Sequence, residues 1–313
     1  MSPRRAAARD SIHGLALGDA FGERWFPLMR TPDQAIAQIK DRRTPPEPKW
    51  HWTDDTAMAL GLLRALYDDG EIRPDHLALV FAHTYMADPA RGYGYGMHQL
   101  LPILADAPAS WPTAARDLFE GQGSLGNGAA MRTAPLGAWF HQDLDRAATQ
   151  ATIAAQVTHQ HPEGVAGGIA VTIAAALAAA GRTTPHTDAG EFIRRTADLT
   201  PPSRVQDGLH HAAELPGDIA PWQAADLLGN GRRIRADDTV PFALWSAAHH
   251  LDSLTDALWT TAEGLGDVDT TCAITGGIVA ARTGITGVPT SWLTRREALP
   301  AWVDAPTPDG PAW

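Results

Sequence analysis

The sequence predicts a single all-α domain. Apolar residues recur at helical spacing in one segment after another, and we find no convincing run of alternating polar and apolar residues that would predict a strand. The chain has 29 glycines and 24 prolines, which separate these segments. We find no long linker and no clear repeat, so we expect one domain over residues 1–313. Its core should cover about 10–300, between a short N-terminal extension and a proline-rich C-terminal one.

The helices are expected in the following order. Small residues over 14–22 predict a closely packed helix that ends in a tight turn. Segment 55–67 places Met58, Leu62 and Leu66 near one stripe, and Pro74 opens the next helix. Six later segments have the same character: 144–157, 164–180, 191–199, 240–250, 252–264 and 271–283.

Composition restricts the possible partners and compartment. The formal net charge is -11, which argues against bulk binding of nucleic acid. A single cysteine, Cys272, excludes an internal disulfide and fits a reducing compartment, so we expect a cytoplasmic protein. The longest apolar run, 169–180, is too short to span a bilayer, and we expect a buried helix there and no membrane association.

Two short acidic motifs lie far apart in the chain and carry the strongest chemical signal. One is Thr53-Asp54-Asp55-Thr56 and the other is Asp267-Val268-Asp269-Thr270, and each precedes a helical segment. Carboxylates and hydroxyls are the hard ligands of Mg²⁺, Mn²⁺ or Ca²⁺. If the fold brings the four carboxylates together, we expect one or two cations to offset their repulsion.

A plainer interpretation stands beside the metal site. Ser, Thr and Asp are common helix N-caps, and acidic residues suit a helix N-terminus. A cap needs one oxygen and each motif offers three or more, so the duplication favours ligands.

A glycine-rich loop over 119–128 precedes a short predicted helix. Glycines let backbone N–H groups approach a phosphate, and Ser124 and Asn127 add hydrogen-bonding side chains. The loop is neither a Walker loop nor a dinucleotide fingerprint, and an ordinary turn is the alternative. Downstream, the His159-Gln160-His161 sequence lacks a third zinc ligand at a diagnostic spacing, so His159 is expected in a polar contact.

Taken together, these motifs resemble the ADP-ribosylglycohydrolase family, which includes the dinitrogenase reductase-activating glycohydrolase. The resemblance runs from Gly14 to about Gly284. It rests on five motifs in family order: 18–22, 52–56, 123–132, Thr158-His159 with the small-residue helix that follows, and 266–270.

The resemblance implies an orthogonal bundle of helices and a site for two divalent cations, Mg²⁺ or Mn²⁺. The implied metal ligands are Thr53, Asp54, Asp55, Asp267, Asp269 and Thr270. The implied contacts to ADP-ribose are Phe119 near the adenine, His159, and the loop residues Gly123, Ser124, Leu125, Gly126, Asn127 and Gly128.

The chain departs from the family pattern at two positions. Many relatives carry a glutamate on a mobile loop seven residues after the aspartate that corresponds to Asp19, where this chain has Phe26. Glu23 lies three residues earlier and is the nearest candidate to replace it. Leu125 stands where some relatives have an aromatic residue.

The implied chemistry is hydrolysis at the anomeric carbon of the distal ribose of an ADP-ribosylated substrate, through an oxocarbenium-like transition state. Asp54, Asp55 or Asp269 would accept the proton of the attacking water, and Glu23 is a candidate donor to the leaving group. Three alternatives remain open: a non-catalytic ADP-ribose-binding module, a hydrolase of a different N- or O-glycoside, and, least favoured, a two-metal phosphoesterase. We expect a monomer.

Overall fold

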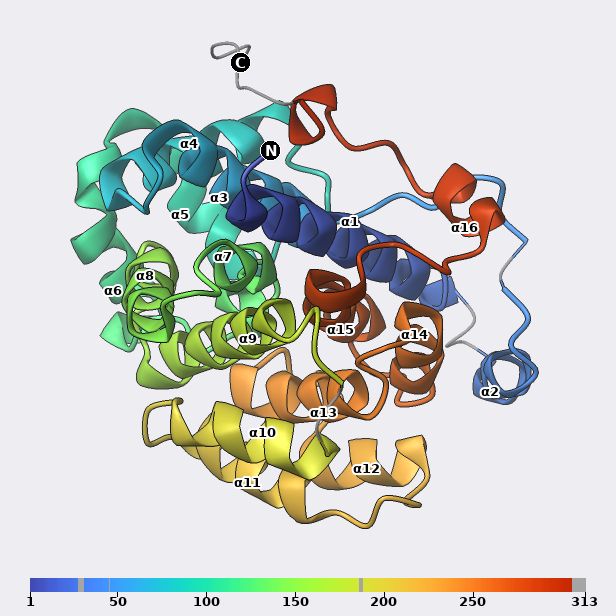
Figure 1. Ribbon diagram of the computed structural model, residues 1–313. Helices are drawn as coiled ribbons and strands as arrows, with labels where there is room; N and C mark the ends of the chain where they lie inside the picture. The colour runs from blue at the N-terminus through green and yellow to red at the C-terminus, as the bar shows by residue number, and fades with distance from the viewer. Residues whose placement is uncertain (28–30, 45, 186–187, 306–313) are drawn as a thin grey trace.

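The computed structural model describes residues 1–27, 31–44, 46–185 and 188–305. Over these residues the chain is helical and forms no strand, only two isolated bridges, which confirms the predicted all-α class. The helices cross one another at steep angles as an orthogonal bundle, and the described ends of the chain lie on the same side of it (Figure 1).

Two helices from opposite ends of the chain form the centre of the bundle. α1 (Pro3–Glu23) packs against α15 (Val268–Thr283) in the most extensive helix contact among the described residues. A Cβ added at Gly14, Gly18 or Gly22 would lie 2.4, 2.0 or 2.3 Å from a backbone oxygen of α15. Because no real side chain fits at such distances, the glycines permit backbone-to-backbone packing along the whole crossing.

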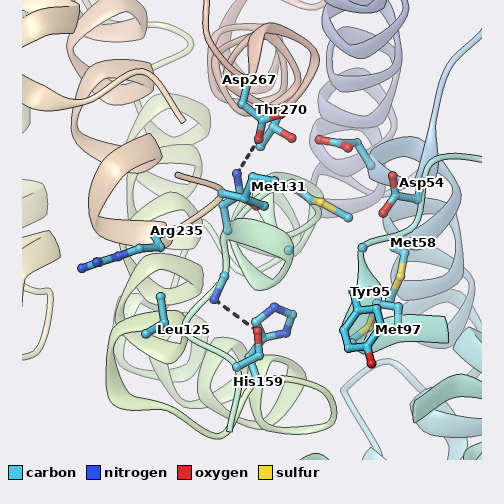
Figure 2. Close-up of a pocket in the computed structure, with 18 of the residues that line it drawn as sticks. Asp54, Met58, Tyr95, Met97, Leu125, Met131, His159, Arg235, Asp267 and Thr270 are labelled. Carbon is cyan, nitrogen blue, oxygen red and sulfur yellow. Dashed lines mark hydrogen bonds between the residues drawn. The ribbon is translucent and has the colours of Figure 1, made fainter. Parts of the chain in front are cut away.

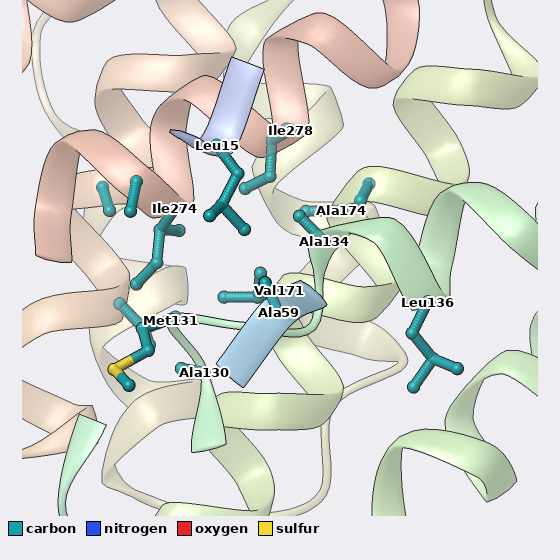
Figure 3. Close-up of a cluster of buried hydrophobic side chains, with 14 of the residues drawn as sticks. Leu15, Ala59, Ala130, Met131, Ala134, Leu136, Val171, Ala174, Ile274 and Ile278 are labelled. Atoms are coloured by element: carbon teal, nitrogen blue, oxygen red, sulfur yellow. The ribbon is translucent and has the colours of Figure 1, made fainter. Parts of the chain in front are cut away.

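The main hydrophobic core lies where this pair meets α3 (Asp54–Asp69), α7 (Ala134–Trp139) and α9 (Pro162–Ala180). Leucine, isoleucine, valine and alanine side chains from these helices converge there (Figure 3). α9 is long and apolar enough to cross a membrane, but 89% of its most apolar window is buried inside the fold. The predicted buried helix over 169–180 is therefore confirmed as the C-terminal part of a core helix.

The remaining helices surround this core. They are α2 (Pro32–Lys40), α4 (Pro74–Ala87), α5 (Tyr95–Asp106), α6 (Trp111–Gly121), α8 (Leu144–Gln156), α10 (Ala189–Asp198), α11 (Arg204–Glu214), α12 (Pro221–Leu228), α13 (Ala236–His249), α14 (Leu254–Ala262) and α16 (Thr290–Arg295), with 3₁₀ turns η2 (Pro108–Ser110), η3 (Asn127–Ala129) and η4 (Ala301–Val303).

The helices predicted from 55–67 onward are present with ends shifted by a few residues, and the one predicted over 14–22 begins much earlier, at Pro3. The short helix predicted after residue 128 is wrong: Asn127–Ala129 is a 3₁₀ turn, and the next α-helix, α7, begins at Ala134. One boundary is wrong in a way that affects function: the expected turn before Glu23 does not form, because α1 continues through Glu23. At the N-terminus, Ala7 and Ala8 are already buried, so packing begins slightly before residue 10. Of the expected C-terminal extension, residues 306–313 lie outside the described residues.

Candidate active site

A cavity of about 520 Å³ lies at the N-terminal ends of α3 and α15, a size suited to a nucleotide-sized ligand. The two acidic motifs and the glycine-rich loop, which are far apart in the sequence, line the same cavity (Figure 2). Its lining includes Asp54, Asp55, Asp267, Asp269, Thr270, Phe119, Gly123, Ser124, Leu125, Gly126, Asn127, Gly128 and His159.

Four carboxylates form the acidic end of the cavity. Asp54 and Asp55 open α3 and are buried, while Asp267 and Asp269 lie at the start of α15 and are half-buried. Burial and then the charge of Asp19 raise the pKa of Asp54 to about 7. Burial also raises the pKa of Asp55 well above its usual range, with the charge of Asp269 as the next cause. The pKa of Asp269 is likewise raised well above its usual range by burial and by the charge of Asp267.

The helix-cap interpretation accounts for only part of this arrangement. Thr53 does cap α3, since its Oγ1 accepts a hydrogen bond from the Asp55 backbone at 3.4 Å. Asp267 occupies the N-cap position of α15, yet its side chain makes no capping bond. Instead its Oδ2 accepts a hydrogen bond from Asn127 at 2.7 Å. The carboxylates of the second motif therefore face the cavity and the glycine-rich loop, where a ligand would lie.

Asp19 is a site residue to which we assigned no role from the sequence. It is fully buried on α1, and its carboxylate accepts hydrogen bonds from the backbone and side chain of Thr53 and of Thr56. Burial raises the pKa of Asp19 to about 6, although these hydrogen bonds oppose the rise. Asp19 thus attaches the first acidic motif to α1. Its motif was visible in the sequence, but a lone acid in a small-residue helix gave no sign of its partners.

The donor set fits divalent cations. In the described part of the chain, Asp55 Oδ1 is a buried oxygen with no hydrogen-bond partner. Leaving such an oxygen unpaired costs free energy, so a ligand is expected to contact it. Mutual repulsion raises the pKa values of carboxylates that lie close together. Clustered carboxylates with raised pKa values are therefore expected at a site for hard metal ions. Among the described residues, no three His, Cys, Asp or Glu side chains lie together closely enough to hold a metal ion in their present positions. The carboxylates line the cavity wall, and Thr53 Oγ1 lies 3.2 Å from Asp55 Oδ2.

The glycine-rich loop forms the opposite end of the cavity. Gly123 has a φ of +71°, and a Cβ there would lie 2.9 Å from the backbone of His161, so the turn requires glycine. Ser124 Oγ accepts a hydrogen bond from the Gly126 backbone at 3.2 Å (Figure 2). The Asn127 amide bridges Asp267 and Thr239. The Asn127 side chain thus connects the loop to the acidic end, and the backbone at Gly126 forms a bridge with Arg235.

His159 packs behind this loop and is buried. Its ring lies so close to Gly128 that a Cβ there would be 3.0 Å from Cε1. Burial, with a smaller contribution from the charge of Arg132, lowers the pKa of His159 to about 3. The imidazole is therefore neutral across the physiological pH range, and it acts as a hydrogen-bonding group and not as a cation.

Exposed apolar side chains surround the cavity mouth. Phe119 is 49% exposed and Ile234 is 63% exposed, and both have a left-handed backbone with φ near +54°. Tyr95, at the start of α5, is 72% exposed. All three line the cavity, and the rings of Phe119 and Tyr95 give flat apolar surfaces for a planar ligand ring. Ile234 was not anticipated, because a single isoleucine between arginines gives no pattern.

Glu23 does not lie where the sequence suggested. The expectation of Glu23 on a mobile loop is wrong, because Glu23 is the last residue of α1 and pairs with Arg24 at 3.5 Å. It is not among the cavity-lining residues, although its charge contributes to the raised pKa of Asp269. Phe26 lies in an adjoining, smaller depression beside Asp267.

The fold and this cavity define a glycohydrolase of the ADP-ribosyl type. The chain belongs to the ADP-ribosylglycohydrolase family, whose family model matches residues 1–307. It is accordingly an enzyme that hydrolyses a glycosidic bond of ADP-ribose.

Individual relatives agree with this assignment. The chain is 27% identical to human ADP-ribosylhydrolase ARH3 over 91% of this chain and 87% of the human protein. It is 25% identical to the ADP-ribosylarginine hydrolase Tri1 of Serratia proteamaculans, over 92% of this chain and 74% of that protein. A solved structure of an ADP-ribosylglycohydrolase-related protein complex superposes with a TM-score of 0.63 at 25% identity, covering 95% of this chain and 94% of that one.

Proposed function

We propose that the protein is a divalent-metal-dependent hydrolase that releases ADP-ribose from an acceptor, either a protein side chain such as Arg or Ser or a small conjugate. The observation that carries this proposal is the cavity itself. It has a carboxylate cluster at one end and, at the other, a glycine-rich loop with a neutral histidine.

The two ends suit the two halves of ADP-ribose. Phe119 provides an exposed ring at the mouth for the adenine, and the glycine-rich loop over 123–128 provides backbone groups for the diphosphate. The distal ribose would then lie at Asp54, Asp55, Asp267 and Asp269, with its anomeric carbon toward them. Two Mg²⁺ or Mn²⁺ ions held there, with Thr53 and Thr270, would orient the ribose hydroxyls and lower the pKa of water.

In the reaction, water attacks the anomeric carbon and the bond to the acceptor breaks. The hydroxyl of the water ends on the ribose, and the acceptor leaves with a proton. Asp54, Asp55 or Asp269 accepts the proton of the attacking water. Asp19 holds Thr53 and Thr56, which fixes the start of α3 and so the direction of Asp54 and Asp55.

The proposal is tested with purified protein, Mg²⁺ or Mn²⁺, and peptides ADP-ribosylated on Arg or on Ser, with products resolved by mass spectrometry. We expect free ADP-ribose and an unmodified peptide. Asp269→Asn should abolish release, while Asp252→Asn, an exposed acid paired with Arg282, should not change it. Release of AMP or phosphate would instead indicate a phosphoesterase, and tight binding without turnover would indicate a binding module.

A different N- or O-glycoside is the second candidate substrate. The observation behind it is Phe26, an apolar side chain beside Asp267 where many relatives have a glutamate. It would be favoured if ADP-ribosylated peptides of both types stay intact while another ribosyl glycoside is cleaved.

A further inference from the structure

Three buried polar side chains form a connected series behind the glycine-rich loop. The Arg132 guanidinium is fully buried over the ring of Phe81, with its carbon 4.4 Å from the ring centre. Its Nη2 donates to Thr158 Oγ1 at 2.8 Å and to the Ala154 carbonyl at 3.1 Å. Thr158 Oγ1 in turn lies 2.7 Å from His159 Nδ1. The series thus runs from a buried cation to the imidazole that lines the cavity.

The direction of each hydrogen bond follows from the donors available. A guanidinium only donates, so Thr158 Oγ1 accepts from Arg132. A threonine hydroxyl has one proton, and the acceptor found for it among the described residues is His159 Nδ1. The reverse direction, with Nδ1–H donating to the hydroxyl, would leave the proton of a fully buried hydroxyl without an acceptor. Thr158 therefore donates to Nδ1.

A neutral imidazole that accepts at Nδ1 must carry its proton on Nε2. The Nε2 edge of His159 faces the cavity loop, since a Cβ added at Gly128 or Gly126 would lie 3.1 or 3.5 Å from Nε2. No protein hydrogen bond to Nε2 is found in the described part of the chain, so this N–H is free for a ligand oxygen.

We propose that Arg132 and Thr158 are positioning residues that fix His159 in its Nε2–H tautomer, so that the imidazole donates a hydrogen bond to an oxygen of the bound ligand. The identity of that oxygen, a diphosphate or ribose oxygen of ADP-ribose, rests on the proposed function. The tautomer does not. His159 then serves as a fixed donor in a cavity whose other end is acidic, and it takes no part as a base.

The tautomer is tested by NMR on ligand-free protein labelled with ¹⁵N-histidine. His159→Gln identifies the His159 signals among those of the 13 histidines. We expect a protonated Nε2 and an unprotonated Nδ1 that do not change between pH 5 and 8. Thr158→Val removes the hydroxyl and should give a mixture of tautomers, whereas Thr158→Ser should keep the wild-type signals. A wild-type protein with its proton on Nδ1 would overturn the proposal.

The effect on binding is measured by calorimetry with ADP-ribose and Mg²⁺. Loss of one oriented hydrogen bond predicts about tenfold weaker binding by Thr158→Val and about wild-type binding by Thr158→Ser. Thr152→Val is the matched control, because its hydroxyl donates only to Ala148 of the same helix. Wild-type affinity in Thr158→Val would refute the positioning role. If the wild-type protein fails to bind ADP-ribose, the proposed function fails while the tautomer measurement still stands.

Discussion

The carboxylate cluster should make the metal-free protein less stable as the pH rises. Burial raises the pKa of Asp54 from about 3.8 in an unfolded chain to about 7 in the folded one. The native state therefore keeps a proton that the unfolded state has lost. Stability is greatest below the unfolded pKa and falls as the pH rises toward the folded pKa.

The magnitude follows from that shift. Each proton held only by the native state changes the free energy of unfolding by about 1.4 kcal/mol per pH unit. Asp54 alone thus accounts for roughly 2.5 kcal/mol between pH 5 and pH 7.5. In a chain of this length, a loss of that size lowers the melting temperature by about 4 °C.

Thermal melts in EDTA at pH 5 and pH 7.5 measure this loss directly. If Mg²⁺ or Mn²⁺ binds the ionised carboxylates of the native state, as we propose, its stabilising effect should be small at pH 5 and large at pH 7.5. Asp54→Asn should melt at a higher temperature than wild type in EDTA at pH 7.5, and its pH dependence should be shallower. Asp252→Asn, which is exposed, should keep the wild-type pH dependence.

Two results would refute this reasoning. One is a metal-free melting temperature that is as high at pH 7.5 as at pH 5. The other is a melt at pH 7.5 that neither EDTA nor added cation changes. Comparison with Asp54→Asn matters because His13, His159 and His250, whose pKa values are lowered by burial, act in the opposite direction at low pH.

Three further predictions test the loop, the helix crossing and Glu23. Gly126→Val should weaken ADP-ribose binding at least tenfold in calorimetry, because a Cβ at this position would lie 3.2 Å from Ser124 Oγ. The metal-dependent melting temperature should not change, and the control variant Gly217→Val, whose Cβ would lie in open space, should bind ADP-ribose normally. Gly18→Ala should cost about 3 kcal/mol or more in urea unfolding, and a native-like midpoint would contradict the crossing. Glu23→Gln should lower turnover less than tenfold, because Glu23 is helical, pairs with Arg24 and is not among the cavity-lining residues. A loss of turnover of 100-fold or more with unchanged ADP-ribose affinity would instead support Glu23 as the proton donor.

The helices that could be predicted are those whose apolar residues show a clear period or a long buried run. Helices such as α5 and α12 were missed because a proline or a glycine lies in or beside them. α11 is a different case. Val205, Leu209 and Ala212 lie on one buried face at helical spacing, but the helix is short and most of its other residues are polar, so its periodic signal is weak.

For the site, the sequence predicted residue types better than positions. The two acidic motifs and the glycine-rich loop do line one cavity, as the resemblance implied. What the sequence lacked was any measure of side-chain direction. Asn127 has the right type for a ligand contact, yet its amide is held by Asp267 and Thr239. Glu23 was placed on a loop because Gly22 suggested a turn, whereas Gly22 in fact serves a helix crossing.

α1 explains how two motifs so far apart in the chain come to share a cavity. Asp19 on this helix binds the backbone and side chains of Thr53 and Thr56, which fixes the start of α3. One turn later, a Cβ at Gly22 would lie 2.6 Å from Asp269 Cα, so the same helix also fixes the start of α15. The residues in the cavity supply the chemistry, but the spacing between the carboxylates is set by the small-residue helix α1. Substitutions on the buried face of α1 should therefore impair metal binding and stability together.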